Sequence, residues 1–448
     1  MKGMLIVTEA LSSPGKPDFV TGNSWRYVSQ TRLLVIDPQH PDKAPEIITS
    51  DFFSARSPEI SYDGNFLLFA AQQYQNDPWQ IWEMELRNLK FRQVTSSSDN
   101  SIDPAYLPGG KVVFCRLSQN DSLKAGHTLY TCNLDGTDLR RITFNPHTYF
   151  APSVLKDGRV ITISRQVYPS HNDPGIMVLR PDGTKAELFY KGNSGSELIS
   201  RGWETPDGKI MFIESENSSS AGGKLVSINY NRPLHTRADL SHSMEGDFRS
   251  VFAMPDGRIL VSYRRSENDL YSIYEFDSGM KAPGNKLYSS TTGNIIEAVA
   301  VYEYERPRKL PSEVDMGVVT GQLLCQNINV TGMNSPESGF SLALADRIEI
   351  IGVDSSLGVV EVEKDGSVYL KIAADMPFRI RTLDAKGATV NGPGGWYWLR
   401  PNERRGCVGC HEDRETVPAN RYAIAVSKEP NVVPVHIAGI KEKQIELE

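Results

Sequence analysis

The sequence predicts an all-β protein in which a six-bladed β-propeller is followed by a smaller β-sandwich-like domain that carries a Cys/His motif. Three observations predict this architecture. Similar short lines of sequence recur at a regular spacing through the first two thirds of the chain. A segment rich in proline and basic residues then interrupts the pattern, and short runs of alternating apolar residues follow it.

The recurring lines each consist of a strand, a glycine turn and a second apolar strand. They are SPEISYDGNFLLF from Ser57, DPAYLPGGKVVF from Asp103, APSVLKDGRVIT from Ala151, GWETPDGKIMF from Gly202 and SVFAMPDGRILVS from Ser250. Their spacings of 46, 48, 50 and 49 residues are measured between the turn glycines, Gly64, Gly110, Gly158, Gly208 and Gly257. This period fits one four-stranded propeller blade, so five blades are predicted directly.

We expect the sixth blade to form from both ends of the repeat region. Three strands near the N-terminus lack an inner partner: 4–9 (MLIVTE), 32–37 (RLLVID) and 46–49 (EIIT). At the other end, 296–302 (IEAVAVY) is an inner strand with no strand after it. Joining these segments closes the ring and removes the exposed strand edges that a split blade would leave.

A linker is expected at 305–312 (ERPRKLPS), which holds two prolines and three basic residues. We therefore assign 1–310 to the propeller and 311–448 to the second domain. Alternating strands such as RIEIIGVD, LGVVEVE and SVYLKIA predict a β-sandwich or β-barrel there.

Near the end of the second domain, Cys407, Cys410 and His411 form the pattern Cys-x-x-Cys-His, which indicates a c-type haem attachment site. Two thiols three residues apart form thioethers with the two vinyl groups of one porphyrin, and the histidine can bind the iron. On one turn of helix the three side chains would share a face. A chain of this length and composition contains the pattern by chance roughly once in a thousand cases.

Two other interpretations of the motif stay open. Cys407 and Cys410 could form a redox disulfide. Alternatively, the two thiols and His411 could hold zinc together with a ligand from elsewhere. A structural zinc site needs four ligands, and no second Cys-x-x-Cys or His-x-x-x-His pair occurs in the sequence. This weakens zinc as the sole occupant.

The blade lines resemble TolB-like six-bladed propellers over roughly residues 4–306. The run LGVVEVEKDGSVYLKIAADMPFRIRTLDAKGATV, followed by WYWLRPNERRGCVGCHEDRE, resembles the haem-bearing domain of proteins related to the hydrazine synthase alpha subunit. The order of the two domains is also similar to that family. The resemblance implies a propeller followed by a small β domain with one c-type haem at Cys407 and Cys410. It does not imply hydrazine synthesis.

The resemblance also implies an iron ligand that this sequence lacks. In the synthase, a tyrosine one turn after the motif histidine binds the iron and leaves that histidine free for zinc. The corresponding position here is Glu415. We therefore expect His411 to be the metal ligand, with Tyr422 as a distant alternative. Met376 and His436 are the nearest other candidates, so an open or weakly held sixth position is expected.

Other polar and aromatic residues are weaker candidates. Four arginines are expected either to pair with haem propionates or to be solvated: Arg400, Arg404, Arg405 and Arg414. Three aromatic residues, among which Trp398 is assigned to the cofactor site, are expected either to contact a porphyrin or simply to pack: Trp396, Tyr397 and Trp398. Cys115 and Cys132 are expected either to form a disulfide or to fill apolar space. No other cysteine is then left as a disulfide partner for Cys325. The propeller histidines are expected in exposed turns: His127, His147, His171 and His242.

The 448 residues carry 48 basic and 55 acidic side chains, a net charge of −7, and the basic residues form no stripe. Nucleic acid is therefore not expected as a partner. No apolar run approaches the length of a membrane-spanning segment, and the first ten residues (MKGMLIVTEA) hold too short an apolar stretch for a signal peptide. Because covalent haem attachment of this type takes place outside the cytoplasmic membrane, we expect a periplasmic or extracytoplasmic protein whose leader has been removed.

Two functions of different classes follow. The first is an extracytoplasmic mono-haem c-type cytochrome-like protein with a redox or electron-transfer role, whose partner is a redox protein or a small molecule such as a small nitrogen compound. Its enzymatic form would be a haem oxidoreductase. The second is a propeller interaction module whose Cys/His site is structural and carries zinc or a disulfide. The sequence identifies neither the substrate nor the oligomeric state.

Overall fold

The computed structural model describes the chain except residues 119–125, 217–219, 278–281, 331–343, 410–421 and 435–448. It divides into two compact units. Unit 1 consists of Met1–Ile142, His147–Pro181 and Glu187–Leu310, and unit 2 consists of Thr143–Pro146, Asp182–Ala186 and Pro311–Glu448. In the described ranges, no helix is both long and apolar enough to cross a membrane.

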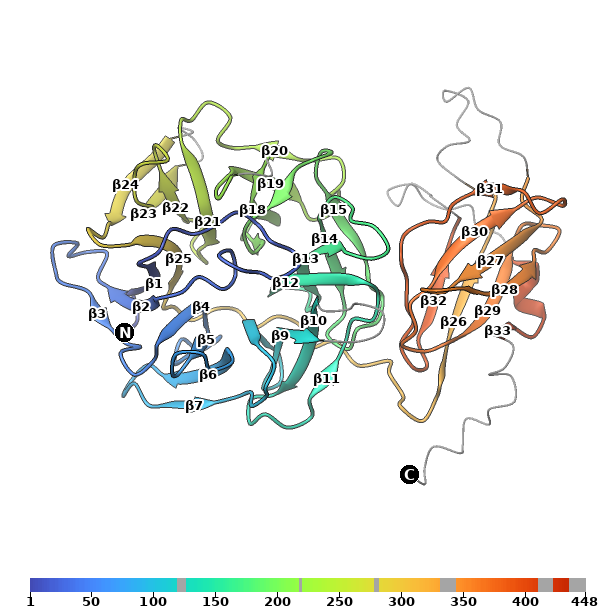
Figure 1. The fold of residues 1–448 in the computed structure, drawn as a ribbon, viewed down its shortest axis with the longest axis horizontal. Helices are drawn as coiled ribbons and strands as arrows, with labels where there is room; N and C mark the ends of the chain where they lie inside the picture. The colour runs from blue at the N-terminus through green and yellow to red at the C-terminus, as the bar shows by residue number, and fades with distance from the viewer. Residues whose placement is uncertain (119–125, 217–219, 278–281, 331–343, 410–421, 435–448) are drawn as a thin grey trace. The chain divides into compact units, whose positions relative to one another are not determined.

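Unit 1 is a ring of six sheets, which confirms the predicted six-bladed propeller (Figure 1). The first three sheets after the closing blade are regular. One contains β4 (Ser54–Ile60), β5 (Phe66–Gln72), β6 (Gln80–Glu85) and β7 (Phe91–Gln93). The next contains β8 (Ser101–Leu107), β9 (Lys111–Ser118), β10 (Gly126–Asn133) and β11 (Arg140–Arg141). The third contains β12 (His147–Val154), β13 (Val160–Gln166), β14 (Gly175–Leu179) and β15 (Glu187–Lys191).

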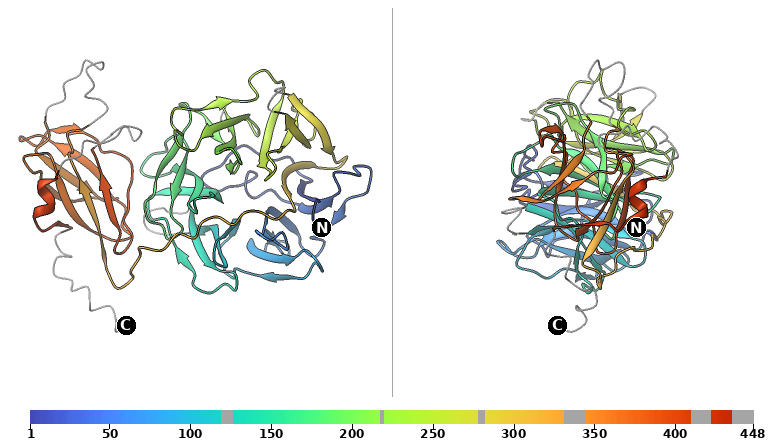
Figure 2. Two further views of the ribbon diagram at one scale, coloured as in Figure 1. Left: turned by 180° about the vertical axis from the view of Figure 1, so that it is seen from behind. Right: turned by 90° about the vertical axis from the view of Figure 1, so that its right-hand side faces the viewer.

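The next two sheets continue the ring, and one of them has an interrupted inner strand. It contains β16 (Glu197–Leu198), β17 (Trp203–Glu204), β18 (Lys209–Ser215), β19 (Lys224–Asn229) and β20 (Ala238–Asp239), with β16 and β17 both paired to β18. The other contains β21 (Asp247–Ala253), β22 (Ile259–Arg264), β23 (Ser272–Asp277) and β24 (Ala282–Tyr288). Figure 2, left, shows the same ring of blades from behind.

The two ends of unit 1 join in the remaining sheet, as the unpaired strands predicted. It runs in the order β25 (Asn294–Ala300), β1 (Leu5–Ala10), β2 (Thr31–Ile36) and β3 (Glu46–Ile47). Leu5 pairs with Ala300 in an antiparallel register. Apolar residues of this blade pack with those of both neighbouring blades in one buried cluster. The closing contact is therefore part of the propeller core.

The inner strands of three blades share a bulge. The register of β4, β8 and β12 shifts at a residue with positive φ that directly precedes a proline: Ser57 (φ 55°), Asp103 (φ 55°) and Ala151 (φ 54°). Prolines in sheets are confined to edges and bulges because they cannot donate to the ladder. A bulge also changes the direction of the side chain that it carries. These positions consequently repeat with the blades.

Unit 2 contains two four-stranded sheets, which confirms the predicted β-sandwich-like domain. One sheet has the order β32 (Arg404–Cys407), β26 (Thr320–Cys325), β29 (Val368–Ala373) and β33 (Asn431–Val433). The other has the order β28 (Ser356–Glu361), β27 (Arg347–Ile351), β30 (Arg379–Leu383) and β31 (Thr389–Asn391). A 3-10 turn, η2, spans Ile424–Ser427. Buried apolar residues of both sheets form one core.

Candidate functional site

The Cys-x-x-Cys-His motif begins at the end of an edge strand. Cys407 is the last residue of β32, which runs parallel to β26. The chain stays attached beyond the strand, because the Gln326 amide donates to the Cys407 carbonyl at 2.9 Å and the Asn327 amide to the Val408 carbonyl at 3.1 Å. The position of the first motif cysteine is therefore determined by the sandwich.

The second spacer residue of the motif, Gly409, is fixed by a close approach. A Cβ atom added there would collide with the carbonyl oxygen and the Cβ of Val330, whereas a Cβ at Gly406 would meet no atom within 4 Å. Because contacts of this kind must be relieved by moving the backbone, only glycine fits position 409 without distortion. The close packing of the described end of the motif against Val330 depends on this glycine.

A third thiol, which sequence analysis left without a partner, lies directly beside the motif. Cys325 is the register partner of Cys407 across the parallel pair of β26 and β32. Cys325 is buried in the sandwich core, and Cys407, which is half-buried, packs against the same core. Residues paired in register direct their side chains to the same face of a sheet. The two thiols therefore face the core together.

The remaining motif residues, Cys410 and His411, lie outside the described residues, as do Arg414, Glu415 and His436. The alignment of both thiols and the histidine on one helical turn stays a prediction. Cys407 itself lies on a strand rather than a helix. Cys407 is only half-buried at the edge of the sheet, although its side chain packs against the sandwich core.

The aromatic and basic candidates before the motif are held in different ways within unit 2. Trp398 is only 2% exposed, and its indole Nε1 donates to the Gly183 carbonyl at 3.2 Å. Arg400 is buried and forms an ion pair with Asp375 at 2.6 Å. Both side chains are therefore used inside the unit, which matches the packing alternative for Trp398.

The two arginines next to the motif are more accessible. Arg405 donates from Nη2 to the Ala186 carbonyl at 2.5 Å, and its guanidinium lies 5.5 Å from the centre of the Tyr397 ring. The side chain of Arg404 is exposed. Arg404 is consequently the better placed of the two to receive an anionic group, such as a propionate, from the solvent side.

The candidate iron ligands in the described residues differ in burial. Met376 is partly buried and packs against the sandwich core. Tyr422 is 73% exposed. No cluster of three or more His, Cys, Asp or Glu side chains suited to a metal ion occurs in the described ranges. These ranges exclude Cys410 and His411, so the metal-binding prediction for His411 is unaffected.

Two expectations for the propeller need correction. His127 and His147 lie on strands rather than in exposed turns: His127 is fully buried on β10, with Nε2 2.5 Å from the Tyr27 hydroxyl, and Nδ1 of His147 lies 2.9 Å from Ser164 Oγ. Burial lowers the pKa of His127 to about 4 and that of His147 to about 3. His171 and His242 are exposed as predicted.

The disulfide considered for Cys115 and Cys132 is also wrong. Both thiols are buried, on β9 and β10, and no disulfide joins them. Cys115 pairs with Leu129 and Cys132 with Val112, so the two residues are offset along the ladder. The alternative, that they fill apolar space, is the one that the structure supports.

Residues 300–412 match the family model described as the hydrazine synthase alpha subunit middle domain. This range includes the complete Cys-x-x-Cys-His motif. Hydrazine synthase subunit alpha of Kuenenia stuttgartiensis is 23% identical over 85% of this chain. This chain is similar to the hydrazine synthase alpha subunit. The predicted family resemblance is thereby confirmed.

The structural comparison agrees with this similarity in fold. The solved structure of Kuenenia stuttgartiensis hydrazine synthase superposes with a TM-score of 0.83 at 21% identity and covers 95% of this chain and 71% of that chain. The Tol-Pal system protein TolB of Francisella tularensis subsp. mediasiatica is 24% identical over 39% of this chain and 38% of its own length. This chain spans 62% of the length of the hydrazine synthase subunit.

Proposed function

We propose that this protein is an extracytoplasmic mono-haem c-type cytochrome-like protein with a redox role. The observation that carries the proposal is the position of Cys407, a half-buried thiol that opens a Cys-x-x-Cys-His motif at the end of an edge strand. The family match to a hydrazine synthase alpha middle domain over the same residues supports it. Small nitrogen compounds are the substrate class that the relative's name suggests.

The described residues around the motif have distinct tasks in this proposal. Cys407 supplies one thioether sulfur, and Gly409 allows the chain to pass Val330 toward the second cysteine. Arg404 is available to neutralise a propionate, because its side chain is exposed. When bound, the haem would supply one-electron chemistry or a site for a small ligand. The protein supplies attachment, orientation and counter-charge.

A second function is favoured by one specific observation. Cys325 lies in register with Cys407, so it could complete a zinc site as the fourth ligand after Cys407, Cys410 and His411. Three thiolates and one imidazole are a usual structural zinc set. In that case the protein would be a propeller interaction module with a structural metal. The sequence alone offered no such fourth ligand.

One experiment separates the two functions. The full chain is expressed with a leader and a cytochrome c maturation system, and then tested by haem staining on a denaturing gel and by metal analysis. The haem proposal predicts a stained band, with iron near one equivalent per chain and little zinc. An unstained protein with one equivalent of zinc, lost in Cys325→Ser, would instead establish the structural site. Cys115→Ser, on a buried propeller thiol, is the matched control.

A further inference from the structure

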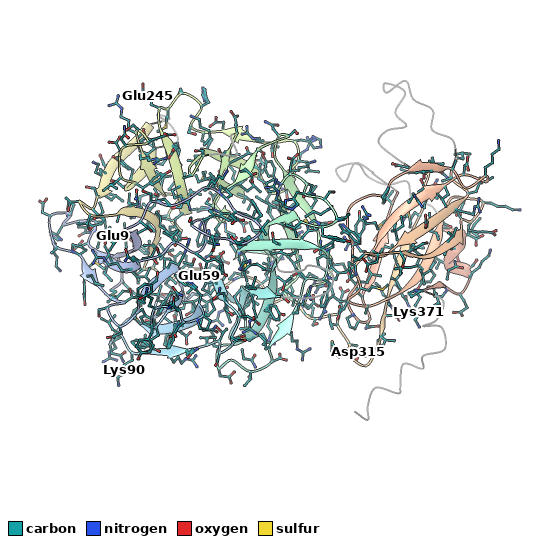
Figure 3. All side chains as sticks on the ribbon, in the orientation of Figure 1. Glu9, Glu59, Lys90, Glu245, Asp315 and Lys371 are labelled. Carbon is teal, nitrogen blue, oxygen red and sulfur yellow. The ribbon has the colours of Figure 1, made fainter. Side chains whose placement is uncertain are left out.

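The inner strands of the propeller enclose a cavity of about 40 Å³, which is lined by both apolar side chains and arginines. Its walls come from the inner strands β4, β21 and β25, and from the segment between β16 and β17. The inner-strand bulges contribute directly, since Ser57 and Arg249 lie at register shifts of β4 and β21. In Figure 3, Glu59 lies toward the middle of the ring, whereas Lys90 and Glu245 lie at its rim.

The connector 11–30 between β1 and β2 forms the rest of the cavity. Figure 1 shows this dark blue segment crossing the middle of the ring. Its Trp25 is fully buried, and the indole donates to the Ile199 carbonyl at 3.0 Å. The carbonyls of Trp25 and Arg26 accept from Arg56 at 3.0 and 2.7 Å. The connector thus holds Arg26 against the inner strands.

Four buried arginines line the cavity, and they outnumber the carboxylates that face them: Arg26, Arg56, Arg201 and Arg249. Arg26 pairs with Asp103, Arg56 with Glu297 at 2.7 Å, and Arg201 with Glu59 at 2.6 Å. In the described part of the chain, Arg249 has no carboxylate partner. Its guanidinium donates to the backbone carbonyls of Gly15, Ala221 and Trp25.

The net charge around the cavity depends on which of the three carboxyl groups paired with the arginines are ionised. Burial opposes ionisation of Asp103 and Glu297, but the neighbouring guanidiniums outweigh it, so the pKa of Asp103 stays well below its usual range and that of Glu297 falls to about 2. Burial raises the pKa of Glu59 to about 7, although Arg201 opposes the shift. The other titratable groups that interact with Glu59 are tyrosines whose pKa burial raises: Tyr62, Tyr106 and Tyr304. The four arginines therefore exceed the ionised carboxylates by one to two charges near neutral pH.

Two of the four arginines, Arg26 and Arg249, lack part of the hydrogen bonding or charge pairing that a buried guanidinium needs. The Nε atom of Arg26, a residue only 5% exposed, is buried and makes no hydrogen bond. Arg249 is equally buried, and burial lowers its pKa to about 10. A buried guanidinium without a counter-charge is unfavourable, because desolvation of the charge is not repaid by an ion pair. A water molecule could satisfy a donor, but it would leave the excess charge uncompensated.

We propose that this cavity is a binding site for one small monovalent inorganic anion, of the size of a halide, held between Arg26 and Arg249. The volume accommodates such an ion, since a single water molecule requires about 10–15 Å³ on the same scale. Guanidinium groups bind anions through several directed N–H donors. Because the partners come from the connector and an inner strand, the bound ion would tie the connector to the ring.

The test uses the full-length protein, prepared in a buffer whose only anion is gluconate, which is too large for the cavity. Sodium bromide then replaces sodium gluconate at constant ionic strength while thermal unfolding is followed. We expect a saturable increase of about 3 °C in the melting temperature, from preferential binding to the folded state. In crystals grown with bromide, an anomalous peak is expected inside the cavity, adjacent to Arg26 and Arg249.

Two variants separate a bound anion from a general salt effect. Arg249→Met removes the unpaired charge, so the saturable bromide response should disappear. The variant also loses the hydrogen bonds to backbone carbonyls, so only the response to bromide, and not the melting temperature in gluconate, is compared with the wild type. Arg265→Met is the matched control, because Arg265 forms an exposed ion pair with Glu245 and should leave the response unchanged.

The proposal is overturned if the melting temperature of the wild type is the same in bromide as in gluconate. It is also overturned if the cavity holds only ordered water in crystals grown with bromide. It is also overturned if Arg249→Met retains the saturable response. If Arg249→Met does not fold, the wild-type titration and the anomalous map still decide the matter.

Discussion

Replacing Asp103 with asparagine should destabilise the propeller more than any exchange of a surface charge. Asp103 is fully buried, and its carboxylate accepts from Arg26, from Ser57 Oγ at 2.9 Å and from the Ala151 amide at 2.9 Å. These donors belong to the connector, β4 and β12, so a single carboxylate joins three segments. Asp103→Asn leaves Arg26 as a buried charge without its partner, which costs about 3–5 kcal/mol of unfolding free energy.

The measurement is urea unfolding of the full chain, followed by the fluorescence of buried tryptophans. Trp25 is a suitable reporter, because the Arg26 guanidinium lies 5.6 Å from its ring centre. Asp256→Asn is the control: its ion pair with Arg258 is largely exposed, and its loss should cost less than about 1 kcal/mol. If Asp103→Asn were as mild as the control, the central charge network would not stabilise the ring as we infer.

Three further outcomes are expected. The pKa of Glu59 is about 7 in the folded protein and 4.5 ordinarily, so protonation of this carboxyl favours the folded state. Its contribution to the free energy of unfolding is complete below pH 4.5 and decreases by about 3 kcal/mol as the pH rises to 7. Glu59→Gln should flatten the dependence of the unfolding free energy on pH in this range, and an unchanged slope would contradict this account. Gly409→Val should reduce the ratio of haem absorbance to protein several-fold, while Gly406→Val should not, because only the first side chain meets Val330. The reduced protein should change its visible spectrum with carbon monoxide, since His411 is the only His or Met between Met376 and His436; an unchanged spectrum would indicate an occupied distal position.

The propeller could be predicted because its evidence is local and repeated. An Asp-Gly or Gly-Gly turn between two apolar strands specifies a hairpin without help from the rest of the chain. Five such turns at a constant period specify blades, and unpaired strands at both ends specify the closure. The bulged inner strands could have been noticed too, since Ser57, Asp103 and Ala151 each precede a proline at the blade period.

The surroundings of the motif could be predicted only in part. The Cys-x-x-Cys-His pattern locates the candidate site, because its chemistry depends on neighbours in sequence. The parallel pairing of Cys325 with Cys407 depends on which strand takes the edge position, and no local pattern specifies this. The close approach of Gly409 to Val330 depends on the same pairing.

The histidine expectations failed for a related reason. Exposed turns are the expectation for His127 and His147, but both lie on strands of a closed ring, where their side chains contact Tyr27 and Ser164. The sequence does not predict the arginine cluster, because its members are far apart in the sequence. Only the ring geometry brings Arg26, Arg201 and Arg249 to one cavity.

The central claim, that Cys407 and Cys410 carry a covalent haem, is tested most directly by peptide mass analysis of protein matured in a cytochrome c system. After digestion and alkylation, we expect the peptide that contains both cysteines to carry the mass of one haem and no alkyl group on either thiol. The Cys407→Ser, Cys410→Ser double variant should lose the haem while the propeller still folds. Recovery of both cysteines in alkylated form from haem-containing protein, or retention of the stained band by the double variant, would contradict thioether attachment at this site.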